Sequence, residues 1–131
     1  MVVSASPYAT AAGLEVLRRG GNAVDAAVTV ALTLAVTYPA AGNLGGGGFL
    51  VARISGQHVA LDFREMAPGA ASPKMYLDSA GNVTEKSLTG ALAAGVPGAV
   101  AGLYEAHRRY GSRPWAELVR SEEHTSELQS L

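Results

Sequence analysis

The chain has 131 residues, with 10 lysine and arginine residues, 11 aspartate and glutamate residues and a formal net charge of −1. This nearly neutral balance, without a basic cluster, argues against a nucleic-acid partner and against binding to an anionic membrane surface. Cysteine is absent, which excludes a disulfide framework and a thiolate metal site. The length suits one domain of ordinary size, and no repeat or low-complexity linker marks a boundary within it.

The first predicted elements are a strand and a helix. Residues 1–5 are apolar and β-branched, which favours a strand. Ser6 and Pro7 predict a helix start, because a serine hydroxyl can cap the first turn and proline is tolerated at the first helical position. Gly20 or Gly21 is expected to end that helix in the left-handed conformation. Its apolar face is predicted to contain Ala11, Leu14 and Leu17.

A second helix is predicted over residues 23–37, with Asn22 as its cap. Its polar residues recur every four positions and form one narrow stripe, so a helix that is apolar on its other sides is expected to be buried. The spacing and the valine content also fit a strand, but the segment far exceeds a typical strand of about five or six residues. It also falls short of the roughly 20 apolar residues that a membrane span requires, so no span is expected. The stripe consists of Asp25, Thr29, Thr33 and Thr37.

Four consecutive glycines at positions 45–48 indicate a need for bare backbone, because each glycine loses more conformational freedom on folding than any other residue. The need is either positive φ or the close approach of a ligand or of a second chain segment. The run lacks the residue spacing of phosphate-binding loops. A close-packed backbone turn is therefore favoured over nucleotide binding.

A β-hairpin is predicted directly after the glycine run. Residues 49–54 indicate one strand, residues 55–57 a three-residue turn, and residues 58–63 the returning strand. Arg64 and Glu65 follow the returning strand and are expected at the base of the hairpin, the end opposite its turn.

The remaining chain predicts a turn at residues 78–82 and a helix that follows the Gly-Val-Pro-Gly stretch at 95–98 and stops at Gly111. A further helix is expected over residues 115–119. Neither His58 nor His107 has a second ligand at metal spacing. We therefore expect no metal site. The helix after residue 98 carries apolar and aromatic side chains at helical spacing: Val100, Leu103, Tyr104 and His107.

Five blocks, in order and at matching spacing, make residues 1–119 similar to the N-terminal part of the large subunit of gamma-glutamyltranspeptidase, also called glutathione hydrolase. This resemblance implies an α/β fold (α+β, layered) that is part of the αββα sandwich of N-terminal nucleophile hydrolases. A partial sandwich is expected to leave the second helix and the hairpin incompletely covered. The blocks are residues 12–17 with 20–27, 42–49 (Gly-Asn-Leu-Gly-Gly-Gly-Gly-Phe), 62–68 (Asp-Phe-Arg-Glu-Met-Ala-Pro), 95–98, and 110–111 with 114–115.

The resemblance assigns substrate binding to Arg64. In the family, the arginine of this motif grips the α-carboxylate of the γ-glutamyl group, and a guanidinium offers paired planar donors that suit a carboxylate. Without the resemblance, an ordinary ion pair of Arg64 with Asp62 or Glu65 is the open alternative. Glu65 is expected to support Arg64 rather than to take part in the chemistry.

The resemblance also implies an enzyme that transfers or hydrolyses γ-glutamyl groups of glutathione or another γ-glutamyl compound, with an amino acid, a peptide or water as acceptor and no cofactor. The family's nucleophile is the N-terminal threonine of a small subunit, which is exposed when the precursor cuts itself. No threonine of this chain stands in that context, so we expect no catalytic residue in it and no activity from it alone. The small subunit is an expected partner, and the family's location is periplasmic or extracellular, with a signal peptide outside this chain.

Two alternatives stay open: a related acylase of the cephalosporin or capsule-processing type, and a non-catalytic module that binds a carboxylate ligand.

The end of the chain has a different origin in this interpretation. Residues 120–130 resemble the translation of a common sequencing adapter, so residues 120–131 are expected to be a non-native tail.

Overall fold

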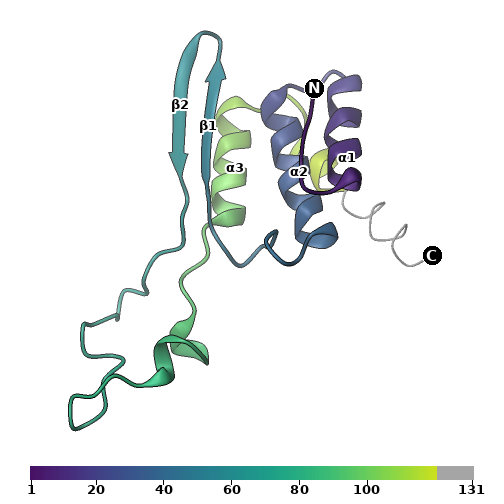
Figure 1. Ribbon diagram of the computed structural model, residues 1–131. Coiled ribbons are helices and arrows are strands. Elements are labelled where there is room, and N and C mark those ends of the chain that lie inside the picture. Colours follow the sequence, from purple (N-terminus) through teal and green to yellow (C-terminus); the bar gives the residue numbers. More distant parts are fainter. Residues whose placement is uncertain (121–131) are drawn as a thin grey trace.

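The computed structural model describes residues 1–120. Its helices and strands are α1 (Pro7–Arg18), α2 (Ala23–Thr37), β1 (Phe49–Ile54), β2 (Gln57–Asp62) and α3 (Ala99–Tyr110), and short 3-10 turns lie at Glu85–Ser87 and Ala91–Ala93. The three helices lie side by side, the hairpin stands next to α3, and the segment between β2 and α3 projects away from the helices (Figure 1). The predicted mixture of helix and strand in layers is confirmed. All of the expected tail except Arg120 lies outside the described residues.

The start of α2 follows the prediction closely. The Asn22 side-chain oxygen accepts hydrogen bonds from the backbone N–H groups of Val24 (2.8 Å) and Asp25 (3.0 Å). The Asp25 carboxylate accepts one in return from the Asn22 N–H (2.8 Å). This reciprocal pair satisfies donors that a helix N-terminus otherwise leaves unpaired, and α2 therefore begins at Ala23.

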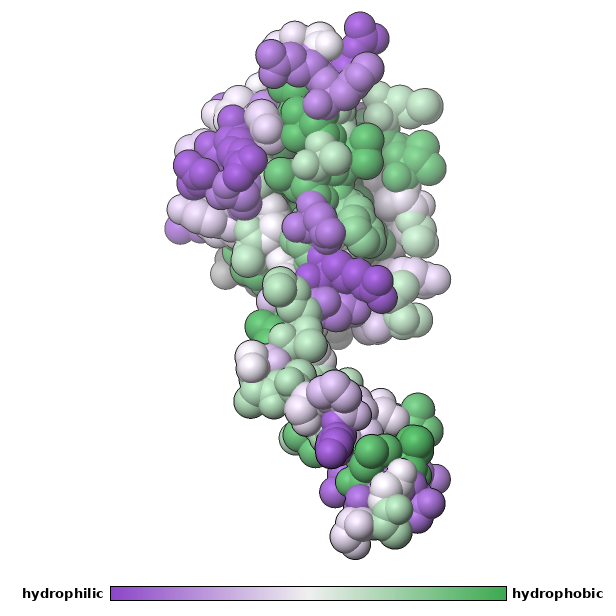
Figure 2. Space-filling view, turned by 90° about the vertical axis from the view of Figure 1, so that its left-hand side faces the viewer, coloured by the Kyte–Doolittle hydropathy of each residue, from purple (hydrophilic) through white to green (hydrophobic). Residues whose placement is uncertain are grey.

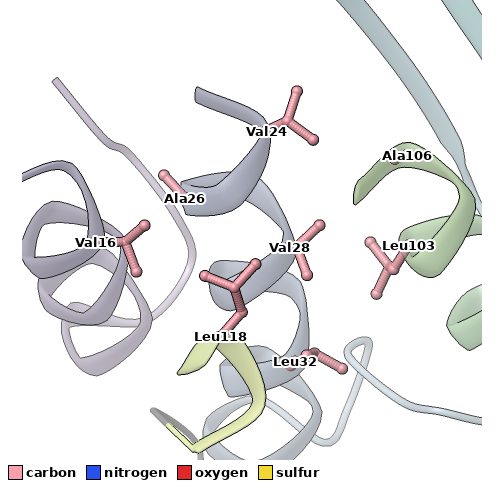
Figure 3. Close-up of a cluster of buried hydrophobic side chains, with 8 residues drawn as sticks. All are labelled: Val16, Val24, Ala26, Val28, Leu32, Leu103, Ala106 and Leu118. Atoms are coloured by element: carbon pink, nitrogen blue, oxygen red, sulfur yellow. The ribbon is translucent and has the colours of Figure 1, made fainter. Parts of the chain in front are cut away.

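The polar stripe of α2 lies on the buried side of the helix. Asp25, Thr29 and Thr33 are fully buried, and the hydroxyls of Thr29 and Thr33 have no hydrogen-bond partner among the described residues. Beside the stripe, apolar residues of all three helices and of the helical residues 115–120 form the core (Figure 3). The cluster consists of Val16, Val24, Ala26, Val28, Leu32, Leu103, Ala106 and Leu118.

The predicted apolar face of α1 is only partly right, because Leu14 and Leu17 are half-buried and Leu17 packs against the core. The residues that α1 buries are Ala9, Gly13 and Val16, whereas Ala11 is exposed. The reason is steric, because α2 approaches α1 at Gly13 so closely that a Cβ there would lie 2.6 Å from a Val30 methyl carbon. A glycine that permits close helix packing carries no hydrophobic signal, so apolar periodicity alone does not identify the fully buried residues of α1.

The N-terminal prediction needs two further corrections. Residues 1–5 are not a strand, because no other described segment pairs with them. Ser6 precedes α1, but its side chain makes no capping bond. The Ser4 hydroxyl is instead hydrogen-bonded to the Thr10 hydroxyl and to the Ser6 carbonyl oxygen, at 2.8 Å each. Gly20 has φ +87°, which confirms the predicted left-handed end of α1.

The hairpin turn is one residue shorter than predicted. Ile54 pairs with Gln57, so the turn consists of Ser55 and Gly56 alone, with φ values of 51° and 83°. Positive φ at both central residues is the requirement of a two-residue turn that matches the twist of the strands. The strand that the sequence predicts over residues 58–63 is therefore β2, Gln57–Asp62.

The two faces of the hairpin differ in their surroundings. Leu50, Ile54 and Leu61 pack against the helical core, while Phe49 and Val51 on the other face are 67% and 84% exposed. Figure 2 views the molecule from the hairpin side, where apolar residues lie open on the upper body and again on the projecting segment. In residues 1–120, no helix combines the length and the apolar character needed to cross a membrane.

Candidate functional site

The glycine run lies between α2 and the hairpin and contacts two later segments of the chain. The carbonyl oxygen of Gly46 accepts hydrogen bonds from the N–H groups of Gly98 and Ala99, both at 2.9 Å, at the start of α3. At Gly47 the backbone of Arg64 and Glu65 leaves no room for a side chain, since a Cβ would lie 2.7 Å from the Arg64 carbonyl carbon. The four glycines of the run have no positive φ. At Gly47 and Gly48 the predicted need for bare backbone is thus met by close approach of the chain to itself.

Phe63 anchors the chain immediately before Arg64. Its N–H donates to the Gly48 carbonyl oxygen (3.0 Å) and its carbonyl oxygen accepts from the Gly48 N–H (3.3 Å), which extends the hairpin ladder by one pair. The ring lies over two glycines, because a Cβ at Gly48 would come 2.9 Å from Phe63 Cε2 and a Cβ at Gly102 would overlap the ring. The Phe63 carbonyl group similarly excludes any side chain at Gly98. Glycine is thus required on three sides of this residue.

Sequence reasoning missed Gly98 and Gly102 as part of this arrangement. Gly102 lies inside α3, where glycine costs about 1 kcal/mol relative to alanine. A glycine in the middle of a helix is the signal that points to close packing, and Phe63 is the residue that occupies the space.

Arg64 is exposed at the base of the hairpin. Its backbone N–H donates a hydrogen bond to Asp62 Oδ1 at 3.0 Å. Its guanidinium group has no ion pair or hydrogen bond with any described residue, so the alternative pairing with Asp62 or Glu65 is absent. Glu65 packs against Gly47 and Gly95 and makes no hydrogen bond to Arg64 within residues 1–120. The guanidinium is thus free to bind an external anion.

Two cavities flank this base of the hairpin. One of about 410 Å³ lies between α2, the glycine loop, β1 and α3 and is largely apolar, with Leu34, Gly47, Phe49, Phe63 and Leu103 in its lining. The other, of about 360 Å³, begins at Glu65 and Met66 and continues along the projecting segment. Arg64 lines neither of them.

Asp25 is the most extensively hydrogen-bonded carboxylate among the described residues, and its role is structural. It accepts hydrogen bonds from the Ser112 hydroxyl (2.5 Å), from the Ser112 N–H (3.0 Å) and from the Arg113 N–H (3.3 Å). Burial raises the pKa of Asp25, but the hydrogen bonds from Ser112, Asn22 and Arg113 outweigh it and hold the pKa below its usual range. The carboxylate fastens the turn after α3 to the N-terminus of α2.

The two histidines lie apart from Arg64. His58 is exposed on β2, and His107 Nε2 is hydrogen-bonded to the Arg113 carbonyl oxygen at 2.6 Å. Within residues 1–120, no three His, Asp or Glu side chains gather closely enough to hold a metal ion.

Comparison with known proteins identifies the family. A model of the gamma-glutamyltranspeptidase family matches residues 9–126. The glutathione hydrolase proenzyme of Pseudomonas aeruginosa is 56% identical over 119 residues, which are 90% of this chain and 21% of that protein. The proenzyme of Escherichia coli is 52% identical over 122 residues, again 21% of its length. The chain thus spans about a fifth of the length of these curated relatives.

Solved structures agree with this assignment. Gamma-glutamyltranspeptidase from Pseudomonas nitroreducens, complexed with L-DON, is 53% identical with a TM-score of 0.88 and covers 92% of this chain and 36% of its own. Cephalosporin acylase from Bacillus halodurans is 29% identical with a TM-score of 0.79, over 93% of this chain and 23% of its own. These neighbours are N-terminal nucleophile hydrolases, which confirms the expected partial fold. With a family match over most of its length and identities above one half, the chain belongs to the gamma-glutamyltranspeptidase family.

Proposed function

We propose that this chain is part of an enzyme that transfers or hydrolyses γ-glutamyl groups, and that Arg64 binds the α-carboxylate of the substrate. The observation that carries the proposal is the exposed guanidinium, which no described residue pairs. It stands on a segment fixed by Phe63 and the surrounding glycines. The fork of donors on a guanidinium can bind both oxygens of a carboxylate and so fix its direction.

The proposed donor substrate is glutathione or another γ-glutamyl compound, and the acceptor is an amino acid, a peptide or water. Support comes from relatives named glutathione hydrolase proenzyme. The reaction needs no cofactor in this proposal. A threonine nucleophile forms a γ-glutamyl ester with loss of the leaving amine, and the acceptor then takes the γ-glutamyl group from that ester.

The nucleophile lies outside this chain in the proposal. It belongs to the small subunit of the same precursor, which agrees with the word proenzyme in the names of the relatives. The chain supplies substrate recognition and the partner subunit supplies the reactive threonine. The chain alone is therefore expected to be inactive.

The test uses the complete enzyme that carries these residues and a chromogenic γ-glutamyl anilide. Loss of one charged fork of hydrogen bonds, worth roughly 1.5 to 3 kcal/mol, lowers kcat/KM of Arg64→Ala about 10- to 150-fold. Arg53→Ala is the matched control, because Arg53 is an exposed arginine at the opposite end of the same hairpin. An unchanged kcat/KM for Arg64→Ala would rule out the carboxylate-binding role.

The related acylases provide the second candidate function. The identity of 29% to the cephalosporin acylase, against 53% to the gamma-glutamyltranspeptidase, favours the γ-glutamyl substrate. Turnover of a cephalosporin side-chain amide, without turnover of the γ-glutamyl anilide, would reverse this choice. Absence of both activities from the complete, processed protein would favour a non-catalytic carboxylate-binding module.

A further inference from the structure

The backbone pairing of the hairpin base is interrupted at Arg64 and Glu65. On one side of the interruption, Phe63 exchanges two hydrogen bonds with Gly48 (3.0 and 3.3 Å). On the other side, Met66 exchanges two with Val96 (3.1 and 2.8 Å). Arg64 thus lies in a short stretch between two paired ones, and its backbone makes no hydrogen bond to the backbone of another residue within residues 1–120.

A side chain supplies the missing partner. Asp62 Oδ1 accepts the hydrogen bond of the Arg64 N–H at 3.0 Å. Asp62 is the last residue of β2 and is itself held in register opposite Phe49. Its carboxylate therefore has a fixed position and can orient the backbone of Arg64, two residues later in the chain.

On the side that faces Gly47, packing limits the movement of Arg64 and Glu65. The backbone of Gly47 contacts Arg64 and Glu65 so closely that a Cβ on Gly47 would lie 2.5 Å from a Glu65 carboxylate oxygen. Close packing keeps the chain from moving toward the glycine loop, and the bond to Asp62 fixes the direction of the Arg64 N–H. Together these contacts determine where the Arg64 side chain leaves the backbone.

We infer that Asp62 is a positioning residue for Arg64: it holds the backbone from which the guanidinium meets the substrate carboxylate. The inference rests on the proposed function of Arg64. In this role the Asp62 carboxylate acts through one oxygen as a hydrogen-bond acceptor and does not touch the substrate. It therefore affects binding of the γ-glutamyl group and not the later chemical steps.

The test compares Asp62→Ala and Asp62→Asn in the complete enzyme with the γ-glutamyl anilide. Asp62→Ala removes the acceptor and raises KM about tenfold, while kcat stays within about twofold, as expected when binding alone is weakened. Asp62→Asn keeps an oxygen at the same position and restores KM to within about threefold of the wild type. Asp78→Ala is the matched control, because Asp78 Oδ1 also accepts from a backbone N–H two residues later, Ala80, at 2.9 Å in a turn remote from Arg64.

Repeating the substitution in an Arg64→Lys enzyme distinguishes a positioning role of Asp62 from a general effect on stability. In an Arg64→Lys enzyme, Asp62→Ala has little further effect on KM, because residues that act through one another are not additive. An equal rise of KM in both backgrounds would overturn the inference, as would Asp62→Asn behaving like Asp62→Ala. If Asp62→Ala lowers the yield of folded enzyme, KM still decides the question, because it does not depend on the amount of active enzyme. Asp62→Asn and the variants in the Arg64→Lys enzyme provide the same comparison.

Failure of the inference and failure of the proposed function give different results. If Arg64→Ala raises KM and Asp62→Ala does not, Asp62 has no positioning role and the function of Arg64 stands. If Arg64→Ala itself leaves KM and kcat/KM unchanged, the proposed function fails and the inference fails with it.

Discussion

Gly47 lies directly against the backbone amide of Glu65, so that no Cβ can be placed on it. At Gly45 in the same run, no atom of residues 1–120 other than those of its own chain neighbours lies within 4 Å of the position that a Cβ would take. The two glycines therefore differ in what a methyl group would meet, although the sequence places them in one uniform run.

The first prediction concerns this difference. Gly47→Ala in the complete enzyme forces apart the glycine loop and the segment of Arg64 and Glu65, and overpacking of this kind costs about 1 to 3 kcal/mol. We expect a lower melting temperature together with a raised KM for the γ-glutamyl anilide. Gly45→Ala is the control and leaves both values near those of the wild type. Equal effects of the two variants would show that the contact at Gly47 is not what the run provides.

The second prediction reverses a general rule. Alanine in place of glycine inside a helix normally adds about 1 kcal/mol of stability. Gly102→Ala is expected to destabilise the protein instead, because the new methyl group overlaps the Phe63 ring. Thermal denaturation of the complete enzyme measures the sign. Phe63→Leu is expected to recover part of the loss in a double variant, and a stabilising Gly102→Ala would contradict the packing of Phe63 described above.

The third prediction concerns Asp25 and pH. The folded pKa of Asp25 is lowered, so its contribution to stability is complete above the unfolded-state pKa of about 3.9 and is lost as the pH falls through the lower folded value. Asp25→Ala leaves the N–H groups of Ser112 and Arg113 without their acceptor, at a cost of about 1 to 3 kcal/mol near pH 7.

The measurement is the free energy of unfolding of Asp25→Ala and wild type between neutral and acidic pH. The difference between the two proteins is expected to shrink as the pH is lowered below about 4. Asp78→Ala is the comparison: hydrogen bonds from Asn82 also lower the pKa of Asp78, but Asp78 lies exposed in a loop, so a smaller difference from wild type is expected at every pH. A difference for Asp25→Ala that does not depend on pH would contradict the role of its ionised form.

The fourth prediction concerns residues 1–119 expressed alone. The outer face of the hairpin exposes Phe49 (67%) and Val51 (84%), and the hairpin has no further strand among the described residues. We expect an insoluble or molten product that binds a hydrophobic dye and has no γ-glutamyl transferase activity. Calorimetry provides the measurement, and a sharp cooperative transition of the isolated segment would count against this expectation.

Local signals in the sequence were sufficient for several elements. The cap at Asn22 and the length of the apolar run gave α2 its bounds, and Gly20 marked the end of α1. The two strand-like segments on either side of Ser55 and Gly56 predict the hairpin, but the predicted turn is one residue too long. The reason is that Gln57 carries no signal that separates a turn from a strand start.

Contacts between distant residues could not be predicted in the same way. Gly13 and Gly102 determine which helix faces are buried, and a hydrophobicity pattern counts them as gaps. Residues 1–5 have the composition of a strand, but a strand also needs a partner, and none of the described segments provides one. The proposed role of Arg64 rests on the family resemblance, since an exposed arginine after a strand is usually without function.

The bonds from Gly46 to the N–H groups of Gly98 and Ala99 have a consequence for biosynthesis. A ribosome adds residue 46 before residue 98, so these two hydrogen bonds cannot form while the intervening projecting segment is being made. Substrate binding by Arg64, as proposed above, would therefore require that residues 98 and 99 have already been made. A nascent chain that stops before residue 98 has the complete motif around Arg64 but lacks the two N–H groups that bind the Gly46 carbonyl oxygen.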